Sequence, residues 1–408
     1  MNKAGSKPTI GIITNGFISW GGGVDFIKMV IRGLAATGKF NLAILVPDHS
    51  TLPERKENRK QNKRNKLLYR LGLRRDYIDT NAGVNEFREF RATMPVLDYH
   101  VYDGGLESVI EKNGIQLLIP SIQPLKPTVT IPWIGYLYDF QHKYLAHFFS
   151  EEERANRDIH FRDMLATAKT VIVNSHAVKN DANTFFPQDH ARIVNLPFTP
   201  MFHQGLLAGN FAELKQKYNL PEKYFIISNQ FWQHKSHITA FRALKEVLDS
   251  IPEKVSIVCT GATSDNRHAA YFEELQAEIH AMGITQQVQF LGYISKEDQV
   301  QILQHAIALI QPTLFEGGPG GGATYDAIAI GQQAIISDIP INQEITDPLV
   351  TFFKVSDHHD LAAKMKAVIA AAPATRQQPD VVQLQKESDQ RLQLLGEVLA
   401  RIVEEELA

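Results

Sequence analysis

The part of the sequence richest in groups that can do chemistry joins two acidic residues through a run of glycines. It starts at Glu316, which ends a predicted buried strand, and reaches Asp326 on the helix that follows. Gly320, Gly321 and Gly322 offer backbone N–H groups and close approach, and the positive end of the helix favours negative charge. We expect a diphosphate here, with Glu316 near sugar hydroxyls and Asp326 near ribose hydroxyls.

A second glycine cluster lies near the N-terminus. Gly22 and Gly23 stand between a predicted strand, Thr9–Ile13, and a helix expected from Val24. Glycines at such a turn let backbone N–H groups approach an anion, although a plain tight turn is the alternative. Phe26 stands where the dinucleotide-binding pattern needs its third glycine, so we expect no nicotinamide cofactor.

Alternating strands and helices must position these glycine segments. Short apolar runs alternate with amphipathic stretches, which is typical of parallel sheets with crossover helices on both faces. The expected strands are Thr9–Ile13, Asn41–Val46, Leu117–Pro120, Ile131–Ile134, Val171–Asn174, Arg192–Asn195, Tyr224–Ser228, Val255–Thr260, Val288–Leu291, Ala308–Gln311 and Ala334–Ser337. The expected helices include Val24–Ala36, His237–Leu248, Tyr271–Met282 and Lys296–His305.

The chain of 408 residues is long enough for two domains. The periodicity is lost at Leu196–Gly209, where two prolines separate halves that each have enough β/α units for a sheet. We therefore expect an α/β fold with two doubly wound, Rossmann-like domains facing a cleft, at residues 1–199 and 200–380. Residues 381–408 have the periodicity of one long helix, and it can pack back on the N-terminal domain.

Several of these motifs together resemble the retaining GT-B glycosyltransferases of the family-4 type (glycosyltransferase group 1). In that family a strand ends in Glu, and a glycine-rich loop and a helix with a second acid follow, as with Glu316 and Asp326. The next strand ends in Ser-Asp-Ile-Pro, here Ser337–Pro340. The resemblance implies an enzyme of the hexosyltransferase type, with the nucleotide sugar in domain 200–380 and the acceptor in domain 1–199.

Other positions match the donor site of the family. Lys235 stands where the family has a Lys that grips the diphosphate, and Gln230 stands where it has an Arg. The segment Phe290–Asp298 resembles the one beside the nucleotide base and contains Gly292 and Tyr293. The resemblance implies that these residues contact the donor.

His142 lies in a segment, Tyr138–Lys143, that resembles the one contributing a donor-site histidine. The resemblance therefore implies a catalytic set of Glu316, Lys235 and His142. A hydrogen-bonded structural histidine is the alternative for His142.

Two departures from the family concern the donor site. Nine residues separate Glu316 from Asp326, whereas the family has seven between its acids, and Thr324 occupies the usual second position. Gln230 also removes one positive charge from the leaving-group site. The sequence has no Asp-x-Asp, so we expect no metal and no other cofactor, with Lys235 and the loop N–H groups in the place of a metal.

Two other functions remain open at this stage. One is a nucleotide-sugar epimerase of the same fold, which would need further acid/base carboxylates in the N-terminal half. The other is a non-catalytic nucleotide-sugar-binding protein, which the substituted Gln230 and the longer loop allow. No His-Glu-x-x-His or Gly-x-Ser-x-Gly motif supports a hydrolase.

The net charge of −3 hides a basic segment at residues 54–75. This segment has ten Lys or Arg and two Glu, which gives it +8 against −11 for the rest of the chain. A basic amphipathic helix on an anionic membrane is one interpretation, and a solvated loop is the other. We expect no nucleic acid, because Tyr69 is the one aromatic residue in the segment.

The remaining composition bears on where the protein works. The single cysteine, Cys259, fits a reducing compartment, and no apolar run approaches the length of a membrane span. We expect a cytoplasmic enzyme of polysaccharide biosynthesis that can sit peripherally on the inner face of the membrane, with a glycan or lipid-linked saccharide as acceptor.

Overall fold

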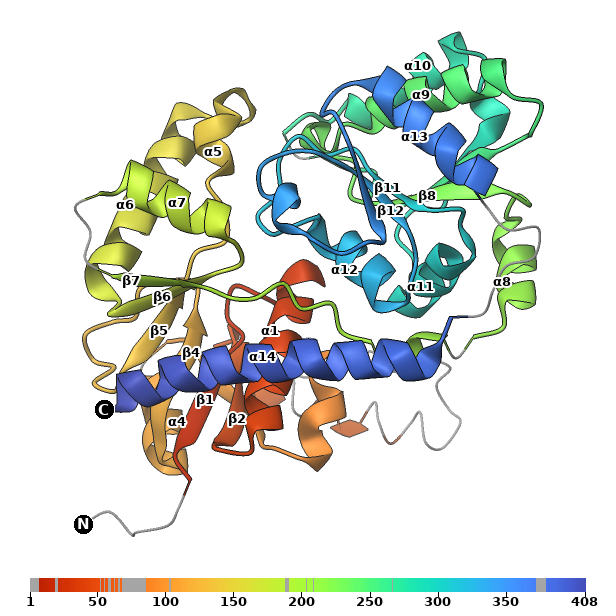
Figure 1. Cartoon of the computed structure of the whole chain (residues 1–408). Coiled ribbons are helices and arrows are strands. Elements are labelled where there is room, and N and C mark those ends of the chain that lie inside the picture. Colours follow the sequence, from red (N-terminus) through yellow and green to blue (C-terminus); the bar gives the residue numbers. More distant parts are fainter. Residues whose placement is uncertain are drawn as a thin grey trace.

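The computed structural model contains two parallel β-sheets with helices packed around them (Figure 1). It describes residues 7–408 except 19–20, 52, 55, 58–59, 62, 65–66, 68–85, 103, 188–190, 203, 208, 266 and 372–378. The predicted fold class, α/β with two doubly wound units, is therefore confirmed. Among the described residues, no helix is both long and apolar enough to cross a bilayer.

The N-terminal sheet has seven strands in the order β3-β2-β1-β4-β5-β6-β7. Its strands are β1 (Thr9–Ile13), β2 (Asn41–Asp48), β3 (Val96–His100), β4 (Ile115–Ser121), β5 (Trp133–Tyr136), β6 (Thr170–Val173) and β7 (Arg192–Asn195). The helices of this half are α1 (Gly21–Thr37), α4 (Gly105–Asn113), α5 (Gln141–Tyr144), α6 (Glu151–Thr167) and α7 (His176–Phe185).

The C-terminal sheet has six strands in the order β10-β9-β8-β11-β12-β13. Its strands are β8 (Tyr224–Ser228), β9 (Ser256–Thr260), β10 (Val288–Phe290), β11 (Leu309–Gln311), β12 (Ala334–Ser337) and β13 (Val350–Phe353). The helices that follow β7 are α8 (Phe211–Tyr218), α9 (His237–Ser250), α10 (Tyr271–Ala281), α11 (Lys296–His305), α12 (Gly321–Ala329), α13 (His358–Ala371) and α14 (Val381–Leu407).

Each sheet is buried on both faces, as its continuous apolar strands require. In β8, Phe225 and Ile227 join the apolar cluster of α9, α10 and α13. Tyr224 and Ile226 point the other way, into the cluster of α11 and α12. The side-chain period of two along a strand thus supplies both layers of helices.

All the predicted strands are present, with bounds within about two residues of the prediction. The helix expected from Val24 begins earlier, at Gly21, so that Gly22 and Gly23 lie in the first turn of α1 instead of in a turn before it. Two edge strands, β3 and β13, were not predicted.

The order of strands gives each sheet one switch point. In the C-terminal sheet the chain leaves β8 toward β9 and later returns to β11 on the other side of β8. In the N-terminal sheet the same change of direction separates β1 from β4. Ligands of doubly wound sheets bind outside the carboxyl ends of the strands at such points, so the loops after β8 and β11 are where a site is expected.

Helix α14 returns from the C-terminal half and runs along the N-terminal half beside α1 (Figure 1). The two helices meet at small residues, since a Cβ on Gly396 would lie 2.6 Å from the carbonyl oxygen of Gly33. Leu395 and Leu399 are fully buried in the core of the N-terminal half. The expected packing of the C-terminal helix on the N-terminal domain is confirmed.

Candidate active site

Lys235 and Glu316 meet at the switch point of the C-terminal sheet. Lys235 follows β8, Glu316 follows β11, and the lysine Nζ lies 2.6 Å from the glutamate Oε1. The amide of Gln311 donates a further hydrogen bond of 3.0 Å to the same oxygen. The two side chains are only 13% and 8% exposed. The structure thus brings together two of the three residues expected to be catalytic.

A set of hydrogen bonds ties the loop after β8 to the loop after β11. The carbonyl oxygen of His234 accepts from the backbone N–H of Leu314 at 2.7 Å and from the hydroxyl of Thr313 at 3.3 Å. Because His234 precedes Lys235 directly, these bonds fix the lysine beside Glu316. The two charges are therefore held by backbone contacts as well as by their own attraction.

The glycine loop lies against Glu316. A Cβ on Gly321 would lie 3.0 Å from Oε2 of Glu316 and 2.9 Å from the amide nitrogen of Gln311. Gly321 also has a φ of +66°, a conformation that other residues rarely adopt. A side chain at position 321 would therefore disturb the acid.

Some of the expected N–H donors of this loop already have partners. The N–H of Gly320 donates to Asn342 at 2.8 Å, and that of Gly321 donates to the carbonyl of Gly318 at 3.2 Å. Gly322 is exposed at the first turn of α12. Thr324 is fully buried, and its hydroxyl donates to the carbonyl of Gly320 at 2.6 Å, so it holds the loop.

Asp326, on α12, pairs with Lys296 at 2.7 Å. Lys296 also reaches Asp25 of α1, in the other domain, at 3.2 Å. Burial raises the pKa of the Asp326 carboxyl, and Lys296 opposes that shift. Burial alone would lower the pKa of Lys296, but the two carboxylates outweigh it and raise that pKa. The acid expected at the ribose thus already has a cationic partner.

The other expected donor residues lie around these loops. Gln230 is exposed after β8, and Tyr293, after β10, is 86% exposed. The carbonyl of Gly292 accepts the N–H of Gly261 at 2.8 Å, which joins the loops after β9 and β10. In the facing domain Gly22 is exposed and Gly23 is buried at the start of α1. That helix carries the Asp25 that contacts Lys296.

His142 is buried in the N-terminal domain, with 1% of its surface exposed. Its Nε2 bonds the carboxylate of Asp158 at 2.8 Å, and its ring packs against Phe161 with centroids 5.5 Å apart. Burial is the main cause that lowers the pKa of His142, and this favours the neutral ring. Among the described residues, no hydrogen bond joins His142 to Lys235 or Glu316.

The comparisons with known proteins bear on the half that holds Lys235 and Glu316. Residues 210–380 match the family model of the glycosyl transferases group 1. The C-terminal domain belongs to this family. Because the chain contains this domain, it is an enzyme of the glycosyltransferase class. A search of curated proteins gives no match.

Solved structures resemble the whole chain. A glycosyltransferase from Rickettsia africae has a TM-score of 0.64 at 13% identity, covering 98% of this chain and 99% of the other. A sucrose-phosphate synthase from Thermosynechococcus elongatus has a TM-score of 0.59 at 15% identity, covering 98% of each chain. HepE from Anabaena, in complex with UDP and glucose, has a TM-score of 0.60 at 13% identity, covering 98% of this chain and 100% of the other. The two domains of this glycosyltransferase therefore together form the GT-B fold.

Contacts between the two domains of the glycosyltransferase were not predicted. The carboxylate of Glu344, after β12, accepts the backbone N–H groups of His176 at 2.9 Å and Ala177 at 2.7 Å, at the start of α7. Lys296 and Asp25 make a second contact. Lys296 lies in the segment that resembles the family's base-binding segment, but the sequence has no signal for its partner on α1.

The expected absence of a metal remains a prediction. In the described part of the chain, Glu246, His358 and His359 have ligand atoms within 4.8 Å of one another and are the group that could hold an ion. They lie on α9 and α13 instead of at Glu316. Lys366 approaches the same Glu246 carboxylate at 3.3 Å, which disfavours a cation there.

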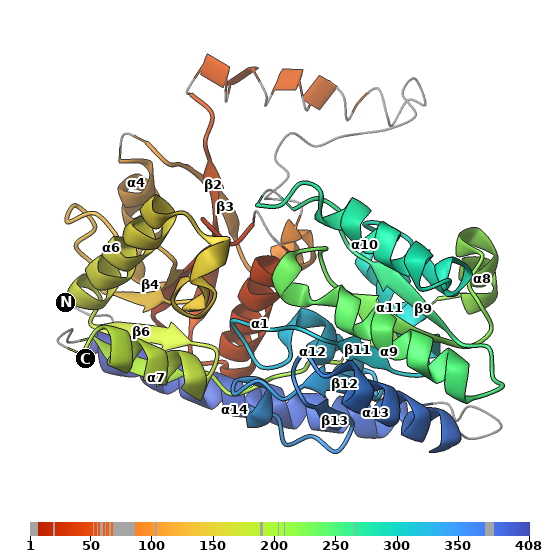
Figure 2. The same ribbon diagram turned by 90° about the horizontal axis from the view of Figure 1, so that it is seen from above.

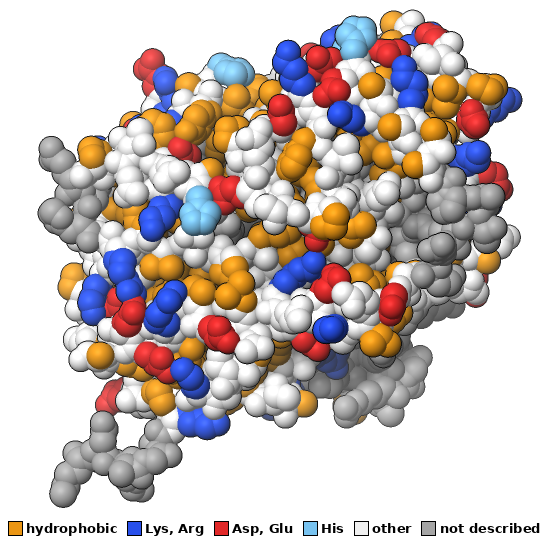
Figure 3. All heavy atoms as spheres, in the orientation of Figure 1, with side chains coloured by type: hydrophobic (Ala, Val, Ile, Leu, Met, Phe, Trp, Pro, Cys, Tyr) orange, Lys and Arg blue, Asp and Glu red, His pale blue; other side chains and the backbone are white. Residues whose placement is uncertain are grey.

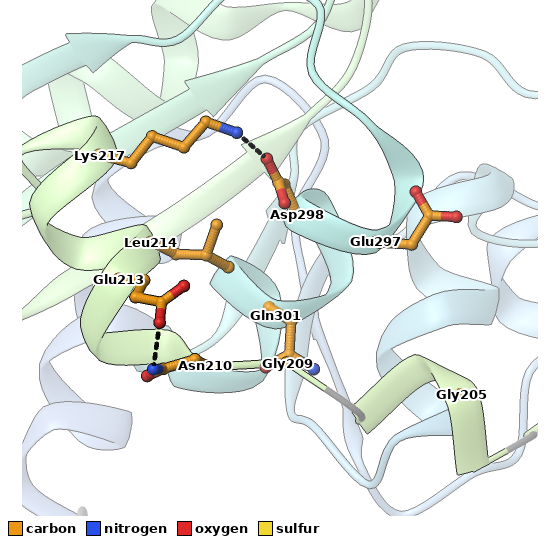
Figure 4. A pocket seen from close by; sticks show the side chains of 9 residues that line it. All are labelled: Gly205, Gly209, Asn210, Glu213, Leu214, Lys217, Glu297, Asp298 and Gln301. Atoms are coloured by element: carbon orange, nitrogen blue, oxygen red, sulfur yellow. Dashed lines mark hydrogen bonds and ion pairs between the residues drawn. The ribbon is translucent and has the colours of Figure 1, made fainter. Parts of the chain in front are cut away.

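A polar hollow of about 530 Å³ lies between α8 and α11 (Figure 4). Lys217 and Asp298 pair across it at 2.7 Å, and Asn210 bonds Glu213 at 2.8 Å (Figure 4). Neither Lys235 nor Glu316 lines it.

On the face seen in Figure 3, acidic and basic side chains are interspersed, so that face has no large patch of one sign.

Proposed function

We propose that this glycosyltransferase moves a sugar from a nucleotide diphosphate donor in its C-terminal domain to an acceptor held by its N-terminal domain. The observation that carries the proposal is the buried Lys235–Glu316 pair at the switch point of the sheet, beside the start of α12. HepE, which has the same fold, binds UDP and glucose, and this supports a nucleotide-sugar donor.

The proposed reaction breaks the bond between the sugar and the diphosphate, so that negative charge builds up on the leaving phosphate. One fixed donor at that point is worth roughly 3–4 kcal/mol. In the structure, the negative charge of Glu316 offsets the positive charge of Lys235. We therefore propose that the bound donor draws Nζ toward its phosphate, while Glu316 accepts a hydrogen bond from a sugar hydroxyl.

Retention and independence from metals are parts of the same proposal. The acceptor attacks from the face that the diphosphate leaves, and the leaving phosphate takes the acceptor proton, so no separate base is needed. Lys235 and the N-terminus of α12 take the place of a metal, in keeping with a sequence that has no Asp-x-Asp. His142, Gln230 and Tyr293 remain predicted donor contacts.

The acceptor is proposed to be a glycan or lipid-linked saccharide at an anionic membrane surface. The basic segment 54–75 lies partly outside the described residues, but Lys56, Lys60, Lys63 and Arg64 are exposed. The described part of the segment lies apart from both sheets, beyond β2 (Figure 2). Changing these four residues to Ser should weaken binding to anionic liposomes, most clearly at low salt. Equal binding of wild type and variant would contradict the membrane role.

A thermal-shift screen with UDP, GDP and their common sugars tests the donor. A ligand at a hundred times its dissociation constant stabilises the folded chain by roughly 2.7 kcal/mol. Lys235→Met and Glu316→Gln should remove transfer, and Lys235→Met should also weaken binding of the nucleotide diphosphate. Lys245→Met, which removes an exposed lysine paired with Asp249 on α9, is the matched control. Transfer at the wild-type rate in either site variant would refute the site.

Product analysis separates the proposed transfer from the alternatives. An epimerase would convert one nucleotide sugar into another without any acceptor. A binding protein would be stabilised by the nucleotide sugar and leave it unchanged.

A further inference from the structure

A pocket of about 280 Å³ opens close to the Lys235–Glu316 pair, between the loops that follow β8 and β9. Its lining combines one aromatic ring with amide, hydroxyl, carboxylate and guanidinium groups. The lining residues are Gln230, Trp232, Ala262, Ser264, Asp265 and Arg267. The backbone N–H of Lys235 donates to the carbonyl of Trp232 at 2.9 Å, so the pocket and the buried pair share one loop.

The walls of this pocket are fixed by a buried carboxylate. Asp265 is 6% exposed and accepts the backbone N–H of Gln233 at 3.3 Å and that of Arg267 at 2.9 Å. A Cβ on Gly261 would lie 2.1 Å from the carbonyl oxygen of Asn229, so the two loops touch directly beside the lining residues Gln230 and Ala262. The backbone thus presents the Arg267 side chain from a fixed position.

The Arg267 guanidinium lacks a close carboxylate. Its nearest one in the described part of the chain is Asp265, at 4.0 Å, and that oxygen already accepts a backbone N–H. Arg157, whose guanidinium carbon lies 5.1 Å from the centroid of the Phe149 ring, is by contrast paired with Asp139 at 2.8 Å. The Arg267 side chain is 27% exposed, and its guanidinium has unfilled donor capacity, which favours an oxyanion that can take two parallel N–H bonds.

Arg267 is also placed between the two domains. Its guanidinium carbon lies 5.4 Å from the ring centroid of Trp232 and 5.0 Å from that of Phe149. One of its N–H groups lies 3.5 Å from the side-chain oxygen of Gln141, the neighbour of His142. The charges of Lys235 and Arg267 both add to burial in lowering the pKa of His234, so both cations lie near this ring.

We propose that this pocket binds an anionic oxygen group of a sugar substrate, a phosphate or a carboxylate, with the Arg267 guanidinium as its main contact. The proposal rests on the proposed function and adds to it a second cation, held by contacts to both domains. The anion belongs either to the diphosphate of the donor or to an acidic sugar of the acceptor.

Isothermal titration of the full chain with UDP, GDP, glucuronate and neutral glucose tests this proposal. The variants are Arg267→Met, which keeps the bulk of the side chain, and Arg267→Lys, which keeps its charge. Arg242→Met is the control, because Arg242 is an exposed arginine of α9 that lies 3.6 Å from Glu278. Thermal melts show whether each variant is folded.

We expect Arg267→Met to weaken at least one anionic ligand about ten- to a hundredfold, the range for a hydrogen bond to a charged group. Glucose binding should not change, and Arg267→Lys should fall in between. Weaker UDP or GDP binding assigns the pocket to the donor diphosphate, and weaker glucuronate binding alone assigns it to the acceptor.

Wild-type affinity of the folded Arg267→Met variant for every anionic ligand overturns the proposal, as does a wild type that binds none of them. If nucleotide binding depends on Lys235 but not on Arg267, the anion-binding role of the pocket is refuted and the proposed function stands. If Lys235→Met binds them like the wild type, it is the proposed donor site that fails.

Discussion

The buried pair of Lys235 and Glu316 makes a prediction that stability alone can test. Three variants are needed: Lys235→Met, Glu316→Gln and the double variant. Each single change leaves one buried group without its charged partner, whereas the double change removes both charges. The energies of the three variants should therefore be strongly non-additive.

The expected sizes follow from the burial and the partners of the pair. Both side chains are less than a sixth exposed, and breaking a buried ion pair from one side costs about 3–5 kcal/mol. Glu316 keeps the hydrogen bond from Gln311 when Lys235 is lost, so Lys235→Met belongs at the lower end, about 3 kcal/mol. The double variant should cost less than the sum of the singles by about 2 kcal/mol or more.

Urea unfolding at pH 7.5, followed by circular dichroism, measures these energies. An exposed pair on α9, Lys245 and Asp249, lies at 2.5 Å and serves as the control cycle. Its coupling should stay below about 0.5 kcal/mol. Additive single changes at Lys235 and Glu316, or a coupling as small as in the control, would refute the reasoning that the pair is buried and mutually dependent.

Three further predictions concern other parts of the chain. Gly396→Val should lower the unfolding free energy by about 1–3 kcal/mol in urea titrations, because its side chain meets the carbonyl of Gly33. Burial lowers the pKa of His234 to about 2 and of His237 to about 3, so the unfolded chain binds protons first as the pH falls below about 6.5. The free energy of unfolding then declines as the pH falls, and His237→Leu should make this decline smaller by about 1.4 kcal/mol per pH unit. Equal slopes of unfolding free energy against pH in wild type and variant would contradict this. EDTA should leave transfer within about twofold, and loss of activity restored by magnesium would contradict the metal-free proposal.

The strands buried on both faces carry the clearest signal, although the edge strands Arg192–Asn195 and Val288–Phe290 were predicted as well. Runs such as Tyr224–Ser228 are almost purely apolar, and both their position and their bounds follow from that. The edge strand Val96–His100 contains Asp98 and His100, and Val350–Phe353 has an exposed Thr351. An edge strand has fewer neighbours to bury it, so its sequence carries a weaker signal.

The loops of the site could be predicted, but not the partners of each group within them. Glu316 and Lys235 stand 81 residues apart, and their meeting follows from the order of strands in the sheet. Asn342, whose side chain accepts a hydrogen bond from the N–H of Gly320, lies 22 residues further along the chain. Gly320 and Thr324 both looked like ligand contacts, yet here each also completes the structure of the loop. Type and spacing show which groups are present, while their partners depend on packing between segments far apart.

Asp326 shows how far this limit reaches. Its position on α12 favours a ligand contact, but in the structure Lys296 holds its carboxylate and also contacts Asp25 of the facing domain. One lysine charge faces two carboxylates, so Lys296 cannot fully neutralise both. A hydroxyl that bonds to Asp326 has to share this carboxylate with Lys296, and any weakening of that pair leaves Lys296 more strongly attracted to Asp25. If a donor hydroxyl binds Asp326, as the sequence predicts, we expect that binding to be coupled to the contact between the domains through the single side chain of Lys296.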